Sequence, residues 1–199
     1  VIRAAGDTAP KAVLTDAAST KAKICANLET ELADRFVGSH PLAGDHRRGP
    51  EHATADLFEG RTVVITPTAA TPAELADRIA DFWENLGARA VSMAPDEHDR
   101  ALAATSHLPH LAASALAAAT PAESLSLAAT GWADTTRIAA GDAALWTQIF
   151  AANRDCVLAA LEPFDAQLGQ FRAALEEEDW DQLERLLNDA KRIRDALGD

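Results

Sequence analysis

The stretch Arg61-Thr62-Val63-Val64-Ile65-Thr66-Pro67 marks the point at which the chain changes character. Its β-branched run predicts a buried strand. Beyond Pro67 the sequence becomes rich in Ala and Leu at helical spacing. Thr71 is placed to cap the first of these helices, and Glu74 completes a capping box over Pro72–Leu86. We therefore expect the strands mainly before residue 70 and a mostly helical chain after it.

Two more strands are predicted before Arg61. The first, Lys11–Asp16, is followed by a helix that runs through Leu32. The second, Arg35–Ser39, precedes a turn-rich stretch. Three strands with so little helix between two of them make a poor independent sheet.

The sequence beyond the first capped helix predicts a short strand at Ala88–Met93 and then more helices. They cover Pro95–Ala119, Gly141–Leu175 and Asp179–Leu197. Pro109 lies inside the first of them. Proline removes a backbone donor and frees the carbonyl four residues earlier, so a polar spot suited to a small ligand is expected there.

The composition limits the kinds of partner. The chain has 199 residues, of which 48% are hydrophobic and 25% charged, as in folded globular proteins. Its formal net charge of −13 disfavours nucleic acid and membrane surfaces, which attract clustered Lys and Arg. The net charge does not exclude a small anionic substrate, since one or two well-placed cationic side chains can bind it. The separated residues Cys25 and Cys156 favour free thiols and a cytoplasmic location.

Two of the polar clusters, Asp16–Lys21 and Gly38–Gly44, offer side chains suited to proton transfer. Asp16 and Ser19 can simply cap the helix that follows them. His40 lies between a predicted strand end and a turn, where its imidazole can accept a proton from an alcohol as hydride leaves. That role needs a second group to fix the tautomer of the ring, and Ser19 is one candidate.

The cluster Ser106–His110 has two interpretations. His107 and His110 share a helical face, which permits a metal site completed by His98 or Asp99. No zinc motif such as HExxH is present. We therefore favour a ligand pocket without metal beside Pro109.

Arg137 also has two interpretations. It can pair with Asp134 on the surface, or its planar guanidinium can hold a substrate carboxylate through two parallel hydrogen bonds. Trp146 follows nine residues later. Arg137 alone does not decide between them.

Taken in order, five motifs resemble those of the prephenate and arogenate dehydrogenases of tyrosine biosynthesis. They are a TDxxSxK-like element at Thr15–Lys21, GSHPLAG at Gly38–Gly44, LFEG and TPT within Leu57–Thr68, SHLPH at Ser106–His110, and DTTRIA at Asp134–Ala139. The acidic helical tail is similar to the dimerising end of the family. The resemblance covers essentially the whole chain.

The resemblance implies an N-terminal Rossmann-type domain that binds NAD or NADP, followed by a helical domain. The sequence contains no GxGxxG, so the chain is expected to lack most of the nucleotide-binding domain. Residues 1–70 should be its last α/β part, and residues 71–199 an all-helical substrate-binding and dimerisation domain. The expected fold class is mostly α, with a truncated Rossmann-type domain in front, and the expected assembly is a homodimer.

The resemblance also implies roles for individual residues. His40 resembles the catalytic base, and Ser19 its hydrogen-bonding partner near the nicotinamide. His110, Arg137 and Trp146 match positions that contact the substrate, with Arg137 on a carboxylate.

The sequence departs from the family pattern near this pocket. Asp45 stands where a small Ser or Thr is usual, and His46, a further candidate for substrate binding, stands where some members carry Glu. Ala133 replaces a basic residue. The choice between prephenate and arogenate is therefore left open.

The activity implied for the parent enzyme is NAD(P)-dependent oxidative decarboxylation of prephenate to 4-hydroxyphenylpyruvate, or of arogenate to tyrosine. The alternative is that the chain by itself is an inactive dimerisation and substrate-binding module. Pyrophosphate recognition depends on a Gly-rich turn, and residues 1–199 contain none. NAD and NADP are accordingly not expected to bind this chain.

Overall fold

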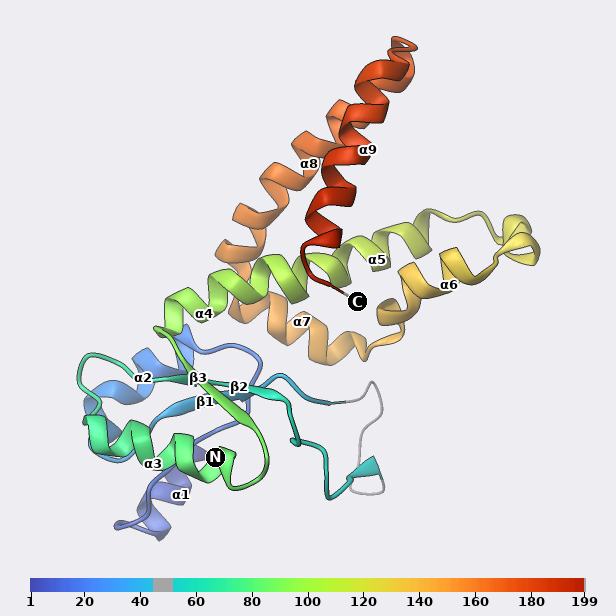
Figure 1. Cartoon of the computed structure of the whole chain (residues 1–199). Helices are drawn as coiled ribbons and strands as arrows, with labels where there is room; N and C mark the ends of the chain where they lie inside the picture. Colours follow the sequence, from blue (N-terminus) through green and yellow to red (C-terminus); the bar gives the residue numbers. More distant parts are fainter. Residues whose placement is uncertain (45–51, 199) are drawn as a thin grey trace. The chain divides into compact units, whose positions relative to one another are not determined.

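The computed structural model describes residues 1–44 and 52–198. The chain divides into two units, Val1–Val157 and Leu158–Asp199 (Figure 1). Most of the described residues are helical, as the sequence predicts, and the strands form one small sheet in the first unit.

The sheet consists of β1 (Gly38–Pro41), β2 (Thr62–Thr66) and β3 (Arg89–Ser92), in the order β1-β2-β3. Strand β1 runs antiparallel to β2 and places His40 opposite Val64. Strand β3 runs parallel to β2. The central position of β2 agrees with its β-branched sequence, because such a strand is buried on both faces.

The predicted strands agree with the sheet to different degrees. The short strand expected at 88–93 is confirmed as β3, so the sheet layer extends beyond residue 70 into the segment expected to be all-helical. The strand expected at Lys11–Asp16 is reduced to a single parallel bridge between Leu14 and Phe36. Hydrogen bonds from Leu14 N–H to the Arg35 carbonyl and from Val37 N–H to the Leu14 carbonyl hold this bridge.

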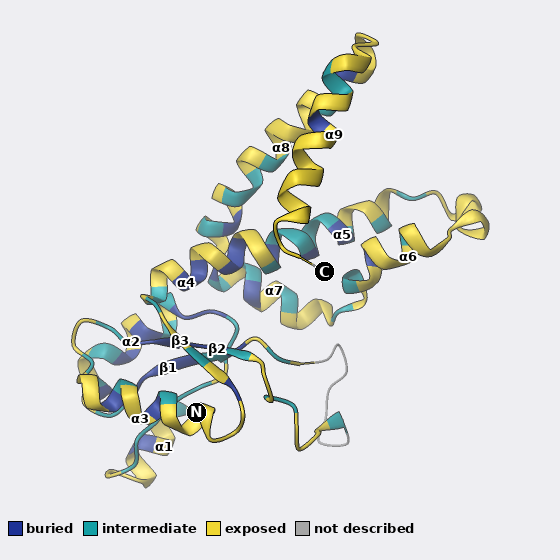
Figure 2. Ribbon diagram, viewed as in Figure 1, coloured by how far each residue is buried: buried dark blue, intermediate teal, exposed yellow. Residues whose placement is uncertain are grey.

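Helix α3 (Ala73–Glu84) packs against the sheet through an apolar cluster. Val63 and Ile65 share one face of β2, because side chains alternate along a strand. They meet Leu75, Ile79 and Trp83, which are spaced four residues apart along α3. Figure 2 shows the buried residues concentrated on β1 and β2 and on one side of the neighbouring helices.

The capping box expected for α3 is wrong. Pro72 occupies the N-cap position and no side chain caps the helix. The Thr71 hydroxyl instead accepts a hydrogen bond from the Thr68 N–H at 2.9 Å, which closes the preceding turn. Local turn formation therefore uses the hydroxyl that the sequence assigns to the cap.

Helix α1 (Ile2–Thr8) and helix α2 (Ala22–Leu32) belong to a second apolar cluster. Its buried members are Cys25, Leu28, Leu32 and Phe36, and the helical spacing of the first three places them on one face of α2.

The helical layer of the first unit begins with α4 (Pro95–Leu102), a π-helical turn η2 (Ala103–His107) and α5 (Leu108–Ala119). The single helix expected over 95–119 is thus interrupted by a wider turn just before Pro109. A proline clashes with the carbonyl four residues earlier, and a π turn relieves that clash.

The rest of this layer consists of short helices. They are η3 (Ala122–Leu127), α6 (Thr130–Thr136), η4 (Arg137–Ala140) and α7 (Ala143–Ala152). The helix expected over Gly141–Leu175 is interrupted at Asn153, and α8 (Arg154–Glu176) follows.

The second unit contains most of α8 together with α9 (Trp180–Asp195). Asp179 caps α9 by accepting a hydrogen bond from the Gln182 N–H at 2.8 Å. Several large apolar side chains of the two helices are exposed: Leu168, Leu175, Leu187 and Ile193. Within the described ranges, no helix is both long and apolar enough to cross a membrane.

Candidate active site

A cavity of about 890 Å³ in the first unit is lined by five of the six residues that the sequence singles out. They are Ser19 before α2, His40 on β1, His110 on α5, Arg137 at the start of η4, and Trp146 on α7. The sixth, His46, lies outside the described residues. The sheet and the helical layer thus contribute side chains to the same space.

His40 is half-buried at the edge of this cavity. Its Nδ1 lies 2.8 Å from Nε2 of His98. Burial is the main cause that lowers the pKa of His40 to about 3, and the nearby groups of His98 and Lys21 lower it further. The imidazole is therefore neutral near pH 7 and can accept a proton.

Ser19 lines the same cavity, but the hydrogen bond expected between Ser19 and His40 is not seen among the described residues. Among the described residues, the hydrogen bond of His40 goes to His98, and none joins it to Ser19. The partner that fixes the ring of His40 in this structure is therefore a histidine from α4.

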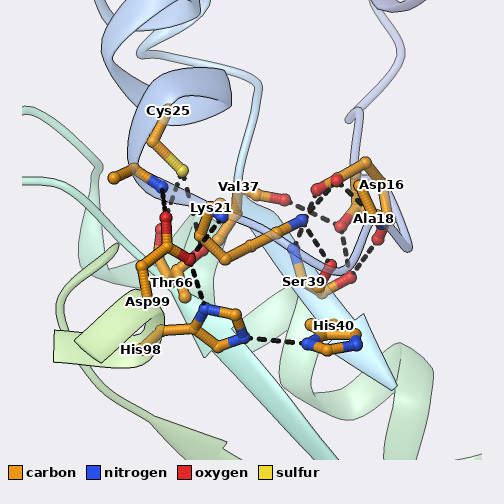
Figure 3. A network of polar contacts seen from close by, with 12 residues as sticks. Asp16, Ala18, Lys21, Cys25, Val37, Ser39, His40, Thr66, His98 and Asp99 are labelled. Carbon is orange, nitrogen blue, oxygen red and sulfur yellow. Dashed lines mark hydrogen bonds and ion pairs between the residues drawn. The ribbon is translucent and has the colours of Figure 1, made fainter. Parts of the chain in front are cut away.

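The chain of hydrogen bonds continues from His98 to Asp99, as Figure 3 shows. His98 Nδ1 lies 2.8 Å from Asp99 Oδ1, and both side chains are buried. The same carboxylate accepts hydrogen bonds from the backbone N–H groups of Lys21 at 2.8 Å and Ala22 at 2.9 Å. Burial raises the pKa of Asp99, but the hydrogen bonds from His98, Lys21 and Ala22 outweigh it and leave that pKa below its usual value.

The contacts of Asp99 explain why Asp16 and Ser19 do not cap α2. The first free N–H groups of α2 point to Asp99, which comes from α4, far along the sequence. From the sequence, His98 and Asp99 are expected only as possible ligands of a metal ion. Among residues 1–44 and 52–198, no group of three or more His, Cys, Asp or Glu side chains is arranged to hold a metal ion.

Asp16 instead forms an ion pair with Lys21, whose side chain is fully buried (Figure 3). The Lys21 ammonium also donates to the Ser39 carbonyl at 2.8 Å, and the Ser39 N–H donates to Asp16 Oδ1 at 3.1 Å. Burial lowers the pKa of Lys21, and Asp16 opposes this shift. The ion pair thus fixes the loop that carries Ser19 to the strand residue next to His40.

The far wall of the cavity is a stack of two rings. His110 and Trp146 lie parallel, with ring centroids 3.6 Å apart and an interplanar angle of 13°. Gly141 passes close to both rings: a Cβ there would lie 2.6 Å from Trp146 Nε1 and 3.0 Å from His110 Cε1. His107 lies on the same helical face as His110, and its Nδ1 is 3.1 Å from Nδ2 of Asn153.

Two arginines line the cavity. Arg137 is exposed and, within the part of the chain that the structure describes, forms no ion pair, so the expected alternative of a pair with Asp134 is not seen. Arg61, the residue just before β2, was not predicted from the sequence. A free guanidinium beside an aromatic wall is suited to an anionic ring compound.

The family is shown by the comparisons with known proteins. A family model described as "Prephenate dehydrogenase, nucleotide-binding domain" matches residues 3–92, and one described as "Prephenate dehydrogenase, dimerization domain" matches residues 94–189. The crystal structure of Synechocystis arogenate dehydrogenase is 31% identical with a TM-score of 0.83, over 94% of this chain and 70% of that chain. The chain belongs to the prephenate dehydrogenase family.

Other members of the prephenate dehydrogenase family are similar over nearly the same residues. Cyclohexadienyl dehydrogenase of Zymomonas mobilis is 35% identical over 93% of this chain and 66% of its own length. A crystal structure of prephenate dehydrogenase from A. aeolicus in complex with hydroxyphenyl propionate and NAD⁺ is 34% identical, with a TM-score of 0.85, over 93% of this chain and 67% of that chain. Prephenate dehydrogenase of Bacillus subtilis is matched over 52% of its length.

The chain thus spans from about half to two-thirds of the length of the curated relatives that it matches. The match of the nucleotide-binding model to residues 3–92 also corrects one expectation. The sequence predicts that most of this domain is missing and that only a remnant at 1–70 is left. That prediction is not borne out, because the matched region includes α3 and β3, whose packing against β2 extends the domain.

Proposed function

We propose that this chain forms the substrate-binding and proton-transfer part of an NAD(P)-dependent enzyme that oxidatively decarboxylates prephenate or arogenate. The observation that carries the proposal is the shared cavity of His40 and Arg137, a neutral base and an unpaired cation among the described residues. A relative in the same family has been crystallised with hydroxyphenyl propionate, an anionic phenol that resembles the expected products.

The proposed reaction begins at the ring carbon that carries the hydroxyl group. His40 takes the hydroxyl proton while hydride leaves that carbon for the nicotinamide, which supplies the two-electron acceptor. The bond from the ring to its carboxylate then breaks, carbon dioxide leaves, and the bond electrons pass into the ring. The phenolate that forms takes the proton back from His40 and becomes an aromatic phenol, whose stability drives the reaction forward.

Arg137 is proposed to bind a substrate carboxylate through its two parallel N–H groups. The stack of His110 and Trp146 forms a flat wall on which the substrate ring can lie. Ser19 lines the cavity beside His40 and is the proposed contact to the nicotinamide end of the cofactor. We also propose His46, from the sequence alone, as a residue that contacts the substrate.

Residues 1–199 contain no Gly-rich phosphate-binding turn, so only the nicotinamide end of a dinucleotide has candidate contacts here. This observation favours a second proposal for the isolated chain, a substrate-binding module that does not turn over. The two proposals are compatible, because the first concerns the full gene product that contains these residues.

Two further proposals concern organisation. We place the boundary between the two domains near residue 93 and not at residue 70, because α3 and β3 pack with the sheet. We also propose a homodimer through the helical part. The match of the dimerization model to residues 94–189 and the exposed apolar side chains Leu187 and Ile193 of α9 support it.

The test of the function is turnover by the full gene product. Prephenate and arogenate are supplied separately with NAD or NADP, and the formation of reduced cofactor, carbon dioxide and the phenolic product is measured. The proposal predicts equal amounts of all three from at least one substrate. Reduced cofactor without carbon dioxide, or no turnover of either substrate, contradicts it.

A further inference from the structure

We propose that Asp99 is a positioning residue that sets the tautomers of His98 and His40 and thereby keeps Nε2 of His40 free of a proton. Neither His98 nor Asp99 lines the cavity, so both act through His40. Only the use made of that nitrogen rests on the proposed function; the tautomers themselves do not.

The first step concerns the carboxylate. Asp99 accepts hydrogen bonds from the Lys21 and Ala22 N–H groups at the N-terminus of α2. An ionised carboxylate has no proton to donate. The proton in the 2.8 Å contact between Asp99 Oδ1 and His98 Nδ1 must therefore belong to His98.

The second step follows from the chemistry of imidazole. A neutral ring carries one N–H, so His98 with a proton on Nδ1 has a lone pair on Nε2. Nε2 of His98 lies 2.8 Å from Nδ1 of His40. His40 must then donate from Nδ1, which leaves its Nε2 as the lone pair available to the cavity.

The competing arrangement has His98 as an imidazolium. His98 would then donate from Nε2, and His40 would carry its proton on Nε2 and could not act as a base there. Two features oppose this arrangement. His98 is fully buried, and burial disfavours the charged ring. The charge of Asp99 is also partly balanced by the two N–H groups and the positive end of the α2 dipole.

With the protons placed in this way, Asp99 acts on His98 as the carboxylate does in other carboxylate–histidine pairs, where it holds the imidazole in one tautomer. The difference here is the second ring, which transmits the preference from a fully buried carboxylate to a half-buried base. It also links the start of α2, which follows the loop of Ser19, to the proton acceptor on β1.

The test is ¹⁵N NMR of the histidine side chains in the chain of residues 1–199, without substrate or cofactor. Near pH 7 the wild-type spectra should show His40 and His98 both neutral and both protonated on Nδ1. A wild-type spectrum with His98 as an imidazolium, or with the proton of His40 on Nε2, overturns the proposal.

Two variants of Asp99 and one matched control complete the test. Asp99→Asn and Asp99→Ala remove the acceptor-only group, so His40 should lose its single Nδ1–H form and show protonation on Nε2. Asp96→Asn makes the same change of charge one turn earlier on α4, at an exposed position, and should leave both rings unchanged. Unchanged His40 tautomers in both Asp99 variants contradict the proposal.

This readout separates the inference from the proposed function. If the tautomers are as expected but the full enzyme turns over without His40, the proposed function fails and the relay stands. If turnover depends on His40 but its proton lies on Nε2, the relay fails and the function stands.

Discussion

The rings of His110 and Trp146 lie parallel, 3.6 Å apart, although they come from different helices, α5 and α7. The segment between these helices brings Gly141 against the edge of the stack. Its φ of −61° and ψ of 154° are open to any residue, so the need for glycine is steric and not conformational.

We predict that Gly141→Ala separates the two rings, because the added methyl group would lie within 3.0 Å of His110 and closer still to Trp146. The expected loss of stability is about 1–3 kcal/mol, as for other overpacked sites. Urea unfolding and Trp fluorescence measure the two effects.

Gly131→Ala is the control for this prediction. Gly131 lies in α6, and nothing within 4 Å would meet its new methyl group. The free energy of unfolding of the Gly131→Ala protein should change by at most about 1 kcal/mol. If Gly141→Ala changed the free energy of unfolding as little as Gly131→Ala, the ring stack would not depend on a glycine at residue 141.

The ion pair of the fully buried Lys21 with the partly exposed Asp16 predicts an unequal response to removal of its two members. Asp16→Asn leaves a fully buried ammonium without its counter-ion, which should cost about 3–5 kcal/mol. Lys21→Met leaves a carboxylate that still accepts hydrogen bonds from the Ala18 and Ser39 N–H groups. It should cost less, and equal losses in urea unfolding contradict this account.

The depressed pKa of His40, about 3, predicts how stability depends on pH. In the unfolded chain a histidine binds its proton near pH 6.5, whereas folded His40 does so only near 3. The contribution of His40 is therefore fully present above about pH 6.5 and is lost as the pH falls toward 3, by up to about 1.4 kcal/mol per pH unit.

Comparison of the wild type with His40→Gln isolates this contribution from the other histidines. The wild type should lose stability more steeply between about pH 6.5 and 4.5. Parallel curves for the two proteins would mean that His40 titrates normally in the folded state.

The parts of the fold that the sequence predicts are those set by local pattern. The β-branched run Val63–Ile65 forms the central strand, and Ala88–Met93 contains β3. Pro109 disturbs its helix as expected, through a π-helical turn. The shared cavity of Ser19, His40, His110, Arg137 and Trp146 follows the motifs that carry the family resemblance.

The relay through His98 and Asp99 was not predicted, because its partners are far apart in sequence. His40 meets His98 58 residues away, and Lys21 meets Asp99 78 residues away. Local rules assign Asp16 and Ser19 to the cap of α2, but tertiary packing brings Asp99 to that position. Such long-range pairing leaves no mark in a single sequence.

We propose that His40 removes a proton during the chemical step while Arg137 holds the substrate. The most direct test is the steady-state kinetics of His40→Asn and Arg137→Ala in the full gene product. His40→Asn should lower kcat by about 10²–10⁴-fold with little change in KM. Arg137→Ala should mainly raise KM, by an amount that fits a charged hydrogen bond of about 1.5–3 kcal/mol. An intact kcat in His40→Asn, or an intact KM in Arg137→Ala, would contradict the role assigned to that residue.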